Sequence, residues 1–208
     1  MSELRPSKIV CVGRNYAAHA AELGNPMPER PMLFLKPPSA LLGHGEAIRL
    51  PAASTQVEYE GEIGVVMGQR FRGGSLAEAE RAIGGFTCVN DVTARDLQRV
   101  DGQWGRAKGF DTFCPAGPRI VRGLDWRTLE LSTRVNGTER QRAPSTSMHF
   151  SIPELIAYIG DIMTLEPGDL IATGTPAGVG PLAPGDVVEV EVSGVGVLSN
   201  TVLSGAEQ

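Results

Sequence analysis

The segment Val57–Met67, VEYEGEIGVVM, combines acidic and apolar residues in a pattern that can support metal chemistry. Side chains alternate between the two faces of a strand, so Glu58, Glu60 and Glu62 are expected to share one face. Aligned carboxylates repel one another, and the apolar run that follows them is typical of a buried strand. A divalent cation would offset this repulsion. A solvated acidic face on an edge strand explains the same pattern, so both interpretations stay open.

A second acidic position follows in the segment CVNDVTARDLQ. A strand is predicted over Phe86–Asn90 and a helix from about Thr93, which places Asp91 at a strand-to-helix junction. That position suits either an active-site carboxylate or a helix N-cap. On a continuous helix, Asp91, Arg95 and Gln98 would lie near one face because of their spacing. The segment therefore predicts a carboxylate, a guanidinium and an amide close together.

Two further motifs contain groups suited to proton transfer or charge stabilisation. In GRNYAAHAAE, His19 and Glu22 are three residues apart on a predicted helix, Asn15–Leu23, so they can hydrogen-bond. A carboxylate that orients an imidazole forms a general-base pair, although a surface ion pair has the same spacing. Lys108, in AKGFDTFCP, is one of three lysines in the chain. Its apolar and turn neighbours suit a functional lysine or an ordinary surface one.

The composition limits the class of protein. The chain has 208 residues, of which 41% are hydrophobic and 21% charged, and this favours one domain over residues 1–208. A net charge of −5 argues against nucleic acid as a partner. No run approaches the roughly 20 apolar residues of a membrane span, and the N-terminal apolar run is too short for a signal peptide. Three cysteines without metal-type spacing favour a reduced compartment. We therefore expect a soluble, cytoplasmic protein.

Glycine and proline divide the chain into many short elements with tight turns. The predicted strands are Lys8–Val12, Met32–Leu35, Val57–Met67, Phe86–Asn90, Asp169–Thr173 and Val187–Val192. Two hairpins are expected, one turning at Asn136-Gly137 and one at Ser193-Gly194. The predicted helices are Asn15–Leu23, Leu76–Ile83, Thr93–Val100 and Ile152–Ile162. Because strands and helices do not alternate regularly, a mostly β fold of the α+β class with peripheral helices is favoured over a doubly wound sheet.

Taken in order along the chain, these motifs resemble those of the fumarylacetoacetate hydrolase superfamily. They are GRNYAAHAAE, FLKPP, YEGEIGVV, NDVTARDLQ, KGFDTFCP and TGTPAGVGP, and they extend from Cys11 to about Val202. The sequence is most similar to the short single-domain branch that includes acylpyruvate hydrolases and oxaloacetate decarboxylases. The resemblance implies the mixed β-roll, or β-barrel-like, fold of that superfamily's C-terminal domain. It also implies a homodimer and a lid over about residues 14–30.

The same resemblance implies a role for nine residues. The metal ligands, for Mg²⁺ or Mn²⁺, would be Glu60, Glu62 and Asp91. The catalytic residues would be His19 and Glu22, as a water-activating pair, and Lys108, as a contact to substrate oxygens. The substrate-binding residues would be Arg95, Gln98 and Thr175, the last holding a carboxylate. Lys36 matches a family position without an evident role, Glu58 lies outside the matched metal motif, and the segment between Gln98 and Lys108 is shorter than in the similar branch.

The activity implied is Mg²⁺-dependent hydrolysis of the C3–C4 bond of an acylpyruvate, such as fumarylpyruvate or acetylpyruvate, to pyruvate and a carboxylic acid. Three protein ligands leave three octahedral positions for a 2-oxo acid and water. Oxaloacetate decarboxylation passes through the same enolate, and isomerisation or decarboxylation of a 2-hydroxymuconate-type diacid from aromatic catabolism suits the same site. A non-catalytic metal-binding β protein is the alternative from another class. One site can support several reactions, so these alternatives stay open.

Overall fold

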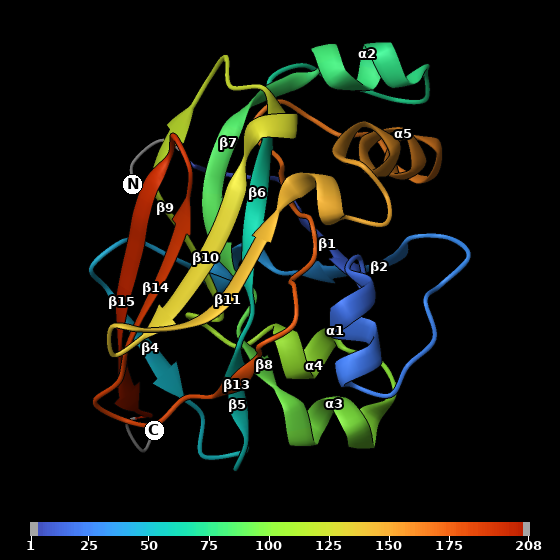
Figure 1. The fold of residues 1–208 in the computed structure, drawn as a ribbon. Helices are drawn as coiled ribbons and strands as arrows, with labels where there is room; N and C mark the ends of the chain where they lie inside the picture. The colour runs from blue at the N-terminus through green and yellow to red at the C-terminus, as the bar shows by residue number, and fades with distance from the viewer. Residues whose placement is uncertain (1–3, 206–208) are drawn as a thin grey trace.

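The computed structural model describes residues 4–205 and consists mostly of β-strands in three sheets (Figure 1). The seven-stranded sheet has the order β2 (Met32–Lys36), β1 (Ile9–Gly13), β12 (Leu170–Ala172), β6 (Gly61–Met67), β7 (Ile83–Asn90), β9 (Cys114–Val121) and β3 (Leu41–Leu42). The five-stranded sheet has the order β11 (Thr138–Pro144), β10 (Glu130–Val135), β14 (Val187–Val192), β15 (Gly196–Ser204) and β4 (Ala47–Leu50). The small sheet consists of β13 (Gly180–Pro181), β5 (Val57–Tyr59) and β8 (Thr93–Ala94). The expected mostly β, α+β class is therefore confirmed.

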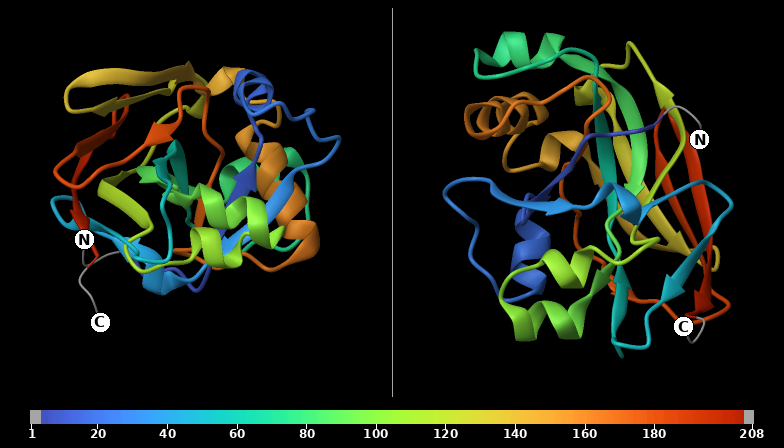
Figure 2. Two further views of the ribbon diagram at one scale, coloured as in Figure 1. Left: turned by 90° about the horizontal axis from the view of Figure 1, so that it is seen from below. Right: turned by 180° about the vertical axis from the view of Figure 1, so that it is seen from behind.

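The helices lie at the periphery, in two groups that Figures 1 and 2 separate clearly. One group contains α2 (Leu76–Arg81) and α5 (Ile152–Ile162), which pack on each other. The other contains α1 (Ala17–Glu22), α3 (Arg95–Asp101) and α4 (Gly105–Lys108). Three short 3₁₀ turns complete the elements: Pro38–Ala40, Trp126–Thr128 and Ser145–Ser147. The second group lies at the end of the sheets where the candidate site is found.

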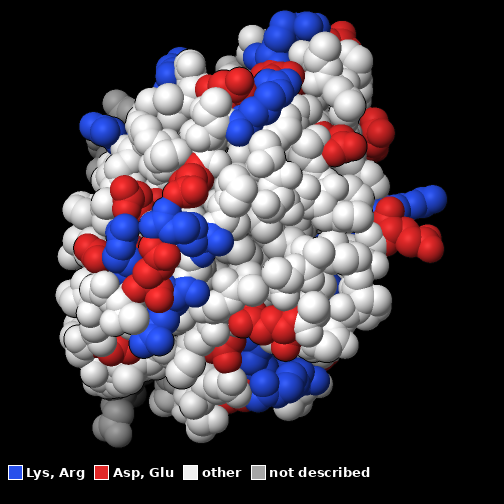
Figure 3. All heavy atoms as spheres, in the orientation of Figure 1, with Lys and Arg blue, Asp and Glu red and all other residues white. Residues whose placement is uncertain are grey.

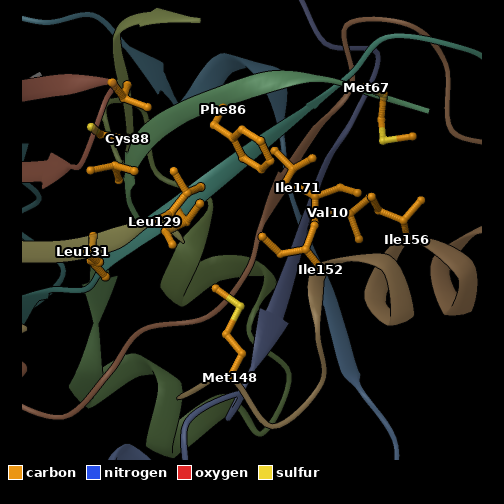
Figure 4. Close-up of a cluster of buried hydrophobic side chains, with 14 of the residues drawn as sticks. Val10, Met67, Phe86, Cys88, Leu129, Leu131, Met148, Ile152, Ile156 and Ile171 are labelled. Atoms are coloured by element: carbon orange, nitrogen blue, oxygen red, sulfur yellow. The ribbon is translucent and has the colours of Figure 1, made fainter. Parts of the chain in front are cut away.

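The main hydrophobic core joins the two large sheets and α5 (Figure 4). Phe86 on β7 and Leu131 on β10 represent the two sheets, and Ile152 and Ile156 represent the helix; all four are buried. The helical spacing predicted α5 with its observed bounds, since it places the apolar residues on one stripe. Glu154 accepts hydrogen bonds from the Ser151 backbone N–H and hydroxyl and so caps the helix N-terminus.

The predicted strand Val57–Met67 is wrong in one respect, because it is broken at Glu60. Its first part, β5, belongs to the small sheet, and its second part, β6, belongs to the seven-stranded sheet. The Asn90 side-chain oxygen accepts the Glu60 N–H at 3.0 Å, and the Asp91 N–H donates to the Glu60 carbonyl at 2.8 Å. These bonds satisfy the backbone at the break and place Glu60 beside Asp91.

The predicted helix from Thr93 is also wrong at its start, because Thr93 and Ala94 form β8 and the helix begins at Arg95. Asp91 therefore neither shares a helix face with Arg95 nor caps the helix, whose N-cap is Ala94. Among the other predicted elements, β14 and α5 have the predicted bounds and the rest are present with shifted ends, whereas β3, β4, β9 and β13 were not predicted. Short elements shift most easily, since tertiary contacts outweigh local propensity in them.

The first predicted hairpin is confirmed, with Asn136 and Gly137 at φ of 52° and 76° between β10 and β11. These two positive values are those of a type I′ turn, which favours Asn-Gly. The second hairpin is present, but its turn has three residues because Val192 pairs with Gly196. The three cysteines are buried and free, as expected of inert thiols.

The face drawn in Figure 3 carries basic and acidic side chains side by side. Among the exposed ion pairs of the protein, Arg142 on β11 pairs with both Glu130 and Glu139. Such exposed pairs contribute little to stability, because solvent and salt screen them. Within residues 4–205, no helix has the length and apolar character needed to cross a membrane.

Asp169 anchors the N-terminal segment to the seven-stranded sheet, so Asp169→Ala is expected to reduce the free energy of unfolding by about 3 kcal/mol. The buried carboxylate accepts bonds from the Ser7 N–H (2.9 Å), the Ser7 hydroxyl (2.7 Å) and the Glu166 N–H (2.8 Å), and it pairs with Lys8. Its removal leaves several donors unsatisfied. Urea denaturation at pH 7 measures the loss.

The same carboxylate predicts a pH dependence. Burial by itself would raise the pKa of Asp169, but hydrogen bonds from Glu166, Lys8 and Ser7 lower it overall. Because the folded pKa lies below the unfolded value of about 3.9, this stabilisation is present above pH 4 and is lost as the pH falls. The difference between wild type and Asp169→Ala should therefore shrink in acid. Glu166→Ala, which removes an exposed pair with Arg70, is the control, and an equal loss in both variants would contradict the prediction.

Candidate active site

The candidate site lies where β6, β7 and the loop after β12 meet. Glu60 and Glu62 flank Gly61, which pairs with Asn90 across β6 and β7, and Asp91 follows Asn90 directly. A Cβ atom at Gly61 would lie only 2.0 Å from the Thr133 Oγ1 of β10, so glycine is required for the close approach of the two strands. The sheet register therefore brings three carboxylates to one point.

The three carboxylates form a cluster with the geometry of a metal site. Glu60, Glu62 and Asp91 are buried, and each offers an oxygen within 4.8 Å of the others. Among residues 4–205, no other set of His, Cys, Asp or Glu side chains meets this criterion. Hard carboxylate oxygens are the ligands that Mg²⁺ and Mn²⁺ prefer. Glu58, which the alternation placed on the same face, instead accepts bonds from Gln56 and Arg95.

Three buried cations compensate the carboxylates. Lys108 donates to Glu60 at 2.7 Å and to Asp91 at 2.5 Å, and Arg95 donates to Glu60 at 2.5 Å and to Glu58 at 2.8 Å. Burial opposes the charge of Lys108, but Asp91 and Glu60 raise its pKa above the ordinary value. Burial likewise opposes ionisation of Glu60, but Lys108 and Arg95 lower its pKa below the ordinary range. Both groups are therefore charged at neutral pH.

Lys36 completes this network. Its ammonium pairs with Asp91 and donates to the Val92 carbonyl at 3.0 Å, and its side chain is fully buried. The sequence analysis left this residue without a role. Its position on β2, 55 residues from Asp91, shows why spacing could not reveal the pair.

Glu62 is the carboxylate of the cluster without a cation bonded to it among the described residues. It accepts the Gly174 N–H at 2.8 Å. Burial, Asp91 and Glu60 raise the pKa of Glu62 well above its usual value. A divalent cation between the three carboxylates would supply the missing positive charge, so the residues fit such an ion.

His19 and Glu22 lie on α1 as the sequence predicted, and they are linked. The His19 Nδ1 atom is 3.3 Å from the Glu22 Oε2 atom. Since a carboxylate only accepts hydrogen bonds, this contact places the proton on Nδ1 and leaves Nε2 as the basic nitrogen. Glu22 also accepts the Gly178 N–H, at 3.0 and 3.2 Å, which ties α1 to the loop after β12. The imidazole is buried and lines the same cavity as the carboxylates.

The hydroxyl of Thr175 forms hydrogen bonds within the protein. It donates to the Gly61 carbonyl at 2.8 Å and accepts from Gln141 at 2.7 Å. The donor is therefore committed within the protein, and only the backbone N–H of Thr175 is left to bind a carboxylate. Gln98 accepts from Arg95 at 2.7 Å, which leaves the Gln98 amide donors for a ligand.

A cavity of about 220 Å³ connects these groups. It is lined by His19, Glu60, Glu62, Asp91, Arg95, Gln98, Lys108 and Thr175, which are eight of the nine predicted site residues. Glu22, the ninth, contacts the cavity through His19. Pockets for drug-sized ligands typically measure about 300–1,000 Å³, so this cavity suits a small molecule.

Sequence reasoning missed the aromatic wall of this cavity. Trp104 packs edge-on against Phe34, with ring centroids 5.2 Å apart, and the Lys108 ammonium lies 4.9 Å from the Phe34 ring centroid. A Cβ atom at Gly13 would lie 2.7 Å from the Trp104 ring. Trp104, in the segment between Gln98 and Lys108, therefore forms part of the cavity wall together with Phe34.

The comparisons with known proteins agree with this geometry. The model of the fumarylacetoacetate (FAA) hydrolase C-terminal family matches residues 8–203. A mitochondrial oxaloacetate decarboxylase from Dictyostelium discoideum is 44% identical, over 90% of this chain and 89% of that protein. The oxaloacetate tautomerase YisK from Bacillus subtilis is 42% identical, over 95% of this chain and 70% of that protein. The structure of a fumarylpyruvate hydrolase from Pseudomonas aeruginosa, in complex with Mn²⁺ and pyruvate, is 33% identical with a TM-score of 0.91, covering 97% of this chain and 91% of that one.

The protein is therefore of the mostly β class, with a buried carboxylate cluster where β6 begins and β7 ends. The chain belongs to the fumarylacetoacetate hydrolase family, as its resemblance predicted.

Proposed function

We propose that the protein is a metal-dependent hydrolase that cleaves the C3–C4 bond of an acylpyruvate. The observation that carries this proposal is the His19–Glu22 pair, which lines the same small cavity as three buried carboxylates. Hydrolysis requires a base that activates water, whereas decarboxylation does not. The relative that contains Mn²⁺ and pyruvate supports a divalent ion and a 2-oxo acid at this site.

Each residue has a defined part in this reaction. Glu60, Glu62 and Asp91 would hold Mg²⁺ or Mn²⁺, which supplies Lewis-acid stabilisation of negative charge on substrate oxygens. His19 accepts a proton from water at Nε2 while Glu22 holds the Nδ1–H. The hydroxide oxygen bonds to the C4 carbonyl carbon, the C3–C4 bond breaks, and its electron pair passes into the enolate of pyruvate. Lys108 balances the charge of the enolate, and a proton returned to C3 gives pyruvate.

Parallel turnover assays with acetylpyruvate and oxaloacetate test the proposal. With Mg²⁺, we expect loss of acetylpyruvate to yield equal amounts of pyruvate and acetate, and EDTA is expected to stop it. Retention of full activity in EDTA would contradict the requirement for a metal ion. Turnover of neither acid would favour an isomerase of a 2-hydroxymuconate-type diacid or a non-catalytic binding protein. The rate with free Mg²⁺ and no protein is the background control.

Oxaloacetate chemistry is the second candidate, since two relatives above 40% identity carry names for it. The same assay distinguishes its two forms. A decarboxylase releases CO₂ with pyruvate faster than Mg²⁺ alone, and a tautomerase changes the enol absorbance of oxaloacetate without forming pyruvate. The homodimer and the cytoplasmic location stay predictions, and size-exclusion chromatography with light scattering tests the former.

A further inference from the structure

Arg14 differs from the other cations that line the cavity. Lys108 and Arg95 are bonded to carboxylates of the cluster, and Arg99 is exposed and donates to Gln56 at 2.7 Å. Within residues 4–205, the ion pairs and side-chain hydrogen bonds include none from the guanidinium of Arg14. Its positive charge is therefore available to a ligand.

The backbone of Arg14 is held in a conformation that residues other than glycine rarely adopt. Its φ is 57°, in the left-handed region. The neighbouring Asn15 enforces this conformation, since its side chain donates to the Phe150 carbonyl at 3.0 Å and to the Thr173 carbonyl at 2.9 Å, and accepts the Phe150 N–H at 2.8 Å. Strained residues of this kind concentrate at ligand-binding sites.

The charges around the cavity indicate what the ligand is. Four buried carboxylates face three buried cations, Lys36, Arg95 and Lys108. These groups have a net charge of minus one. A divalent cation in the cluster and the positive charge of Arg14 would change the net charge of the site to plus two. A ligand with two negative charges would neutralise the site. A monocarboxylate would leave an excess positive charge in a partly desolvated cavity.

We propose that Arg14 binds a second carboxylate of the substrate, in addition to the 2-oxo acid group, and so gives a preference for dicarboxylic over monocarboxylic 2-oxo acids such as acetylpyruvate. The inference rests on the proposed function, because it takes the 2-oxo acid group to lie at the carboxylate cluster. Arg14 lines the same cavity of about 220 Å³ as Glu60 and Glu62, so one small ligand in that cavity can contact all three residues. Bidentate pairing with a guanidinium adds affinity and orientation.

Calorimetric titration of the Mn²⁺-loaded protein with two inert acids tests this role. 2-Oxoglutarate and 2-oxovalerate share a 2-oxo acid group and five carbons, and they differ in a terminal carboxylate or methyl group. The wild type is expected to bind 2-oxoglutarate more tightly. Arg14→Asn should lower the affinity for 2-oxoglutarate about 10–100-fold, since a charge-assisted hydrogen bond contributes free energy of this magnitude. The affinity for 2-oxovalerate should stay unchanged. Asparagine tolerates the left-handed backbone conformation, so the midpoint of thermal unfolding of the Arg14→Asn variant should match or exceed that of the wild type.

Arg14→Lys is the matched charge-preserving variant and should retain part of the preference for 2-oxoglutarate. Equal affinity of the wild type for both acids, or an equal loss of affinity for both in Arg14→Asn, would overturn the inference about Arg14 and leave the proposed function standing. Failure of the Mn²⁺-loaded wild type to bind either acid would overturn the proposed function as well.

Discussion

Glu62→Ala is expected to lower the affinity for Mg²⁺ or Mn²⁺ by more than about 100-fold and to abolish turnover of acetylpyruvate. Loss of residues that only support metal ligands costs about 10–100-fold, and a direct ligand should cost more. Glu62 is the preferred target because Glu60 also pairs with Lys108 and Arg95, so its removal would leave buried cations unpaired. Calorimetry with Mn²⁺ and the acetylpyruvate assay measure the two effects.

Proton competition adds a pH dependence to this prediction. Burial, Asp91 and Glu60 raise the pKa of Glu62, so protons compete with the metal at this carboxylate. The affinity of the wild type should therefore rise as the pH rises towards the pKa of Glu62 and become constant above it. Glu58→Gln is the matched control, since Glu58 lies outside the cluster and should leave the affinity for Mn²⁺ close to that of the wild type. Normal Mn²⁺ binding by Glu62→Ala would refute the metal site.

His19→Ala should lower kcat for acetylpyruvate by about 10²–10⁴-fold, the usual contribution of a general base, while the affinity for Mn²⁺ stays unchanged. The imidazole is held by Glu22 and does not belong to the carboxylate cluster, so its loss removes proton transfer without removing a metal ligand. Steady-state kinetics and calorimetry on one preparation separate these effects.

Glu22→Gln is the companion variant for the same hypothesis. The amide can still accept the Gly178 N–H through its oxygen, so α1 should stay attached to the loop after β12. It no longer carries the charge that stabilises a protonated imidazole, and kcat should fall less than in His19→Ala. Unchanged acetylpyruvate turnover in His19→Ala would exclude His19 as the general base of the hydrolysis.

Local patterns determined a large part of the fold. The apolar stripe Ile152–Ile162 and the Asn136-Gly137 turn were predicted from spacing and turn chemistry, and both are observed. The patterns failed where tertiary contacts decide, as at Glu60, where the Asn90 side chain replaces a regular strand bond. The helix start moved to Arg95 for a similar reason, since Thr93 pairs with β5.

By itself, the sequence determined which residue types are available and, through the order of its motifs, the family and nine candidate residues. The tertiary structure decided which of them meet. Sheet register places Asp91 beside Glu60, and packing pairs Lys36 with Asp91 and joins Glu22 to Gly178, 156 residues away. It also bonded the Thr175 hydroxyl to the Gly61 carbonyl and left the Arg14 guanidinium without an ion pair among residues 4–205. Spacing encodes neighbours along one helix or strand, whereas contacts between distant segments depend on how completed elements pack.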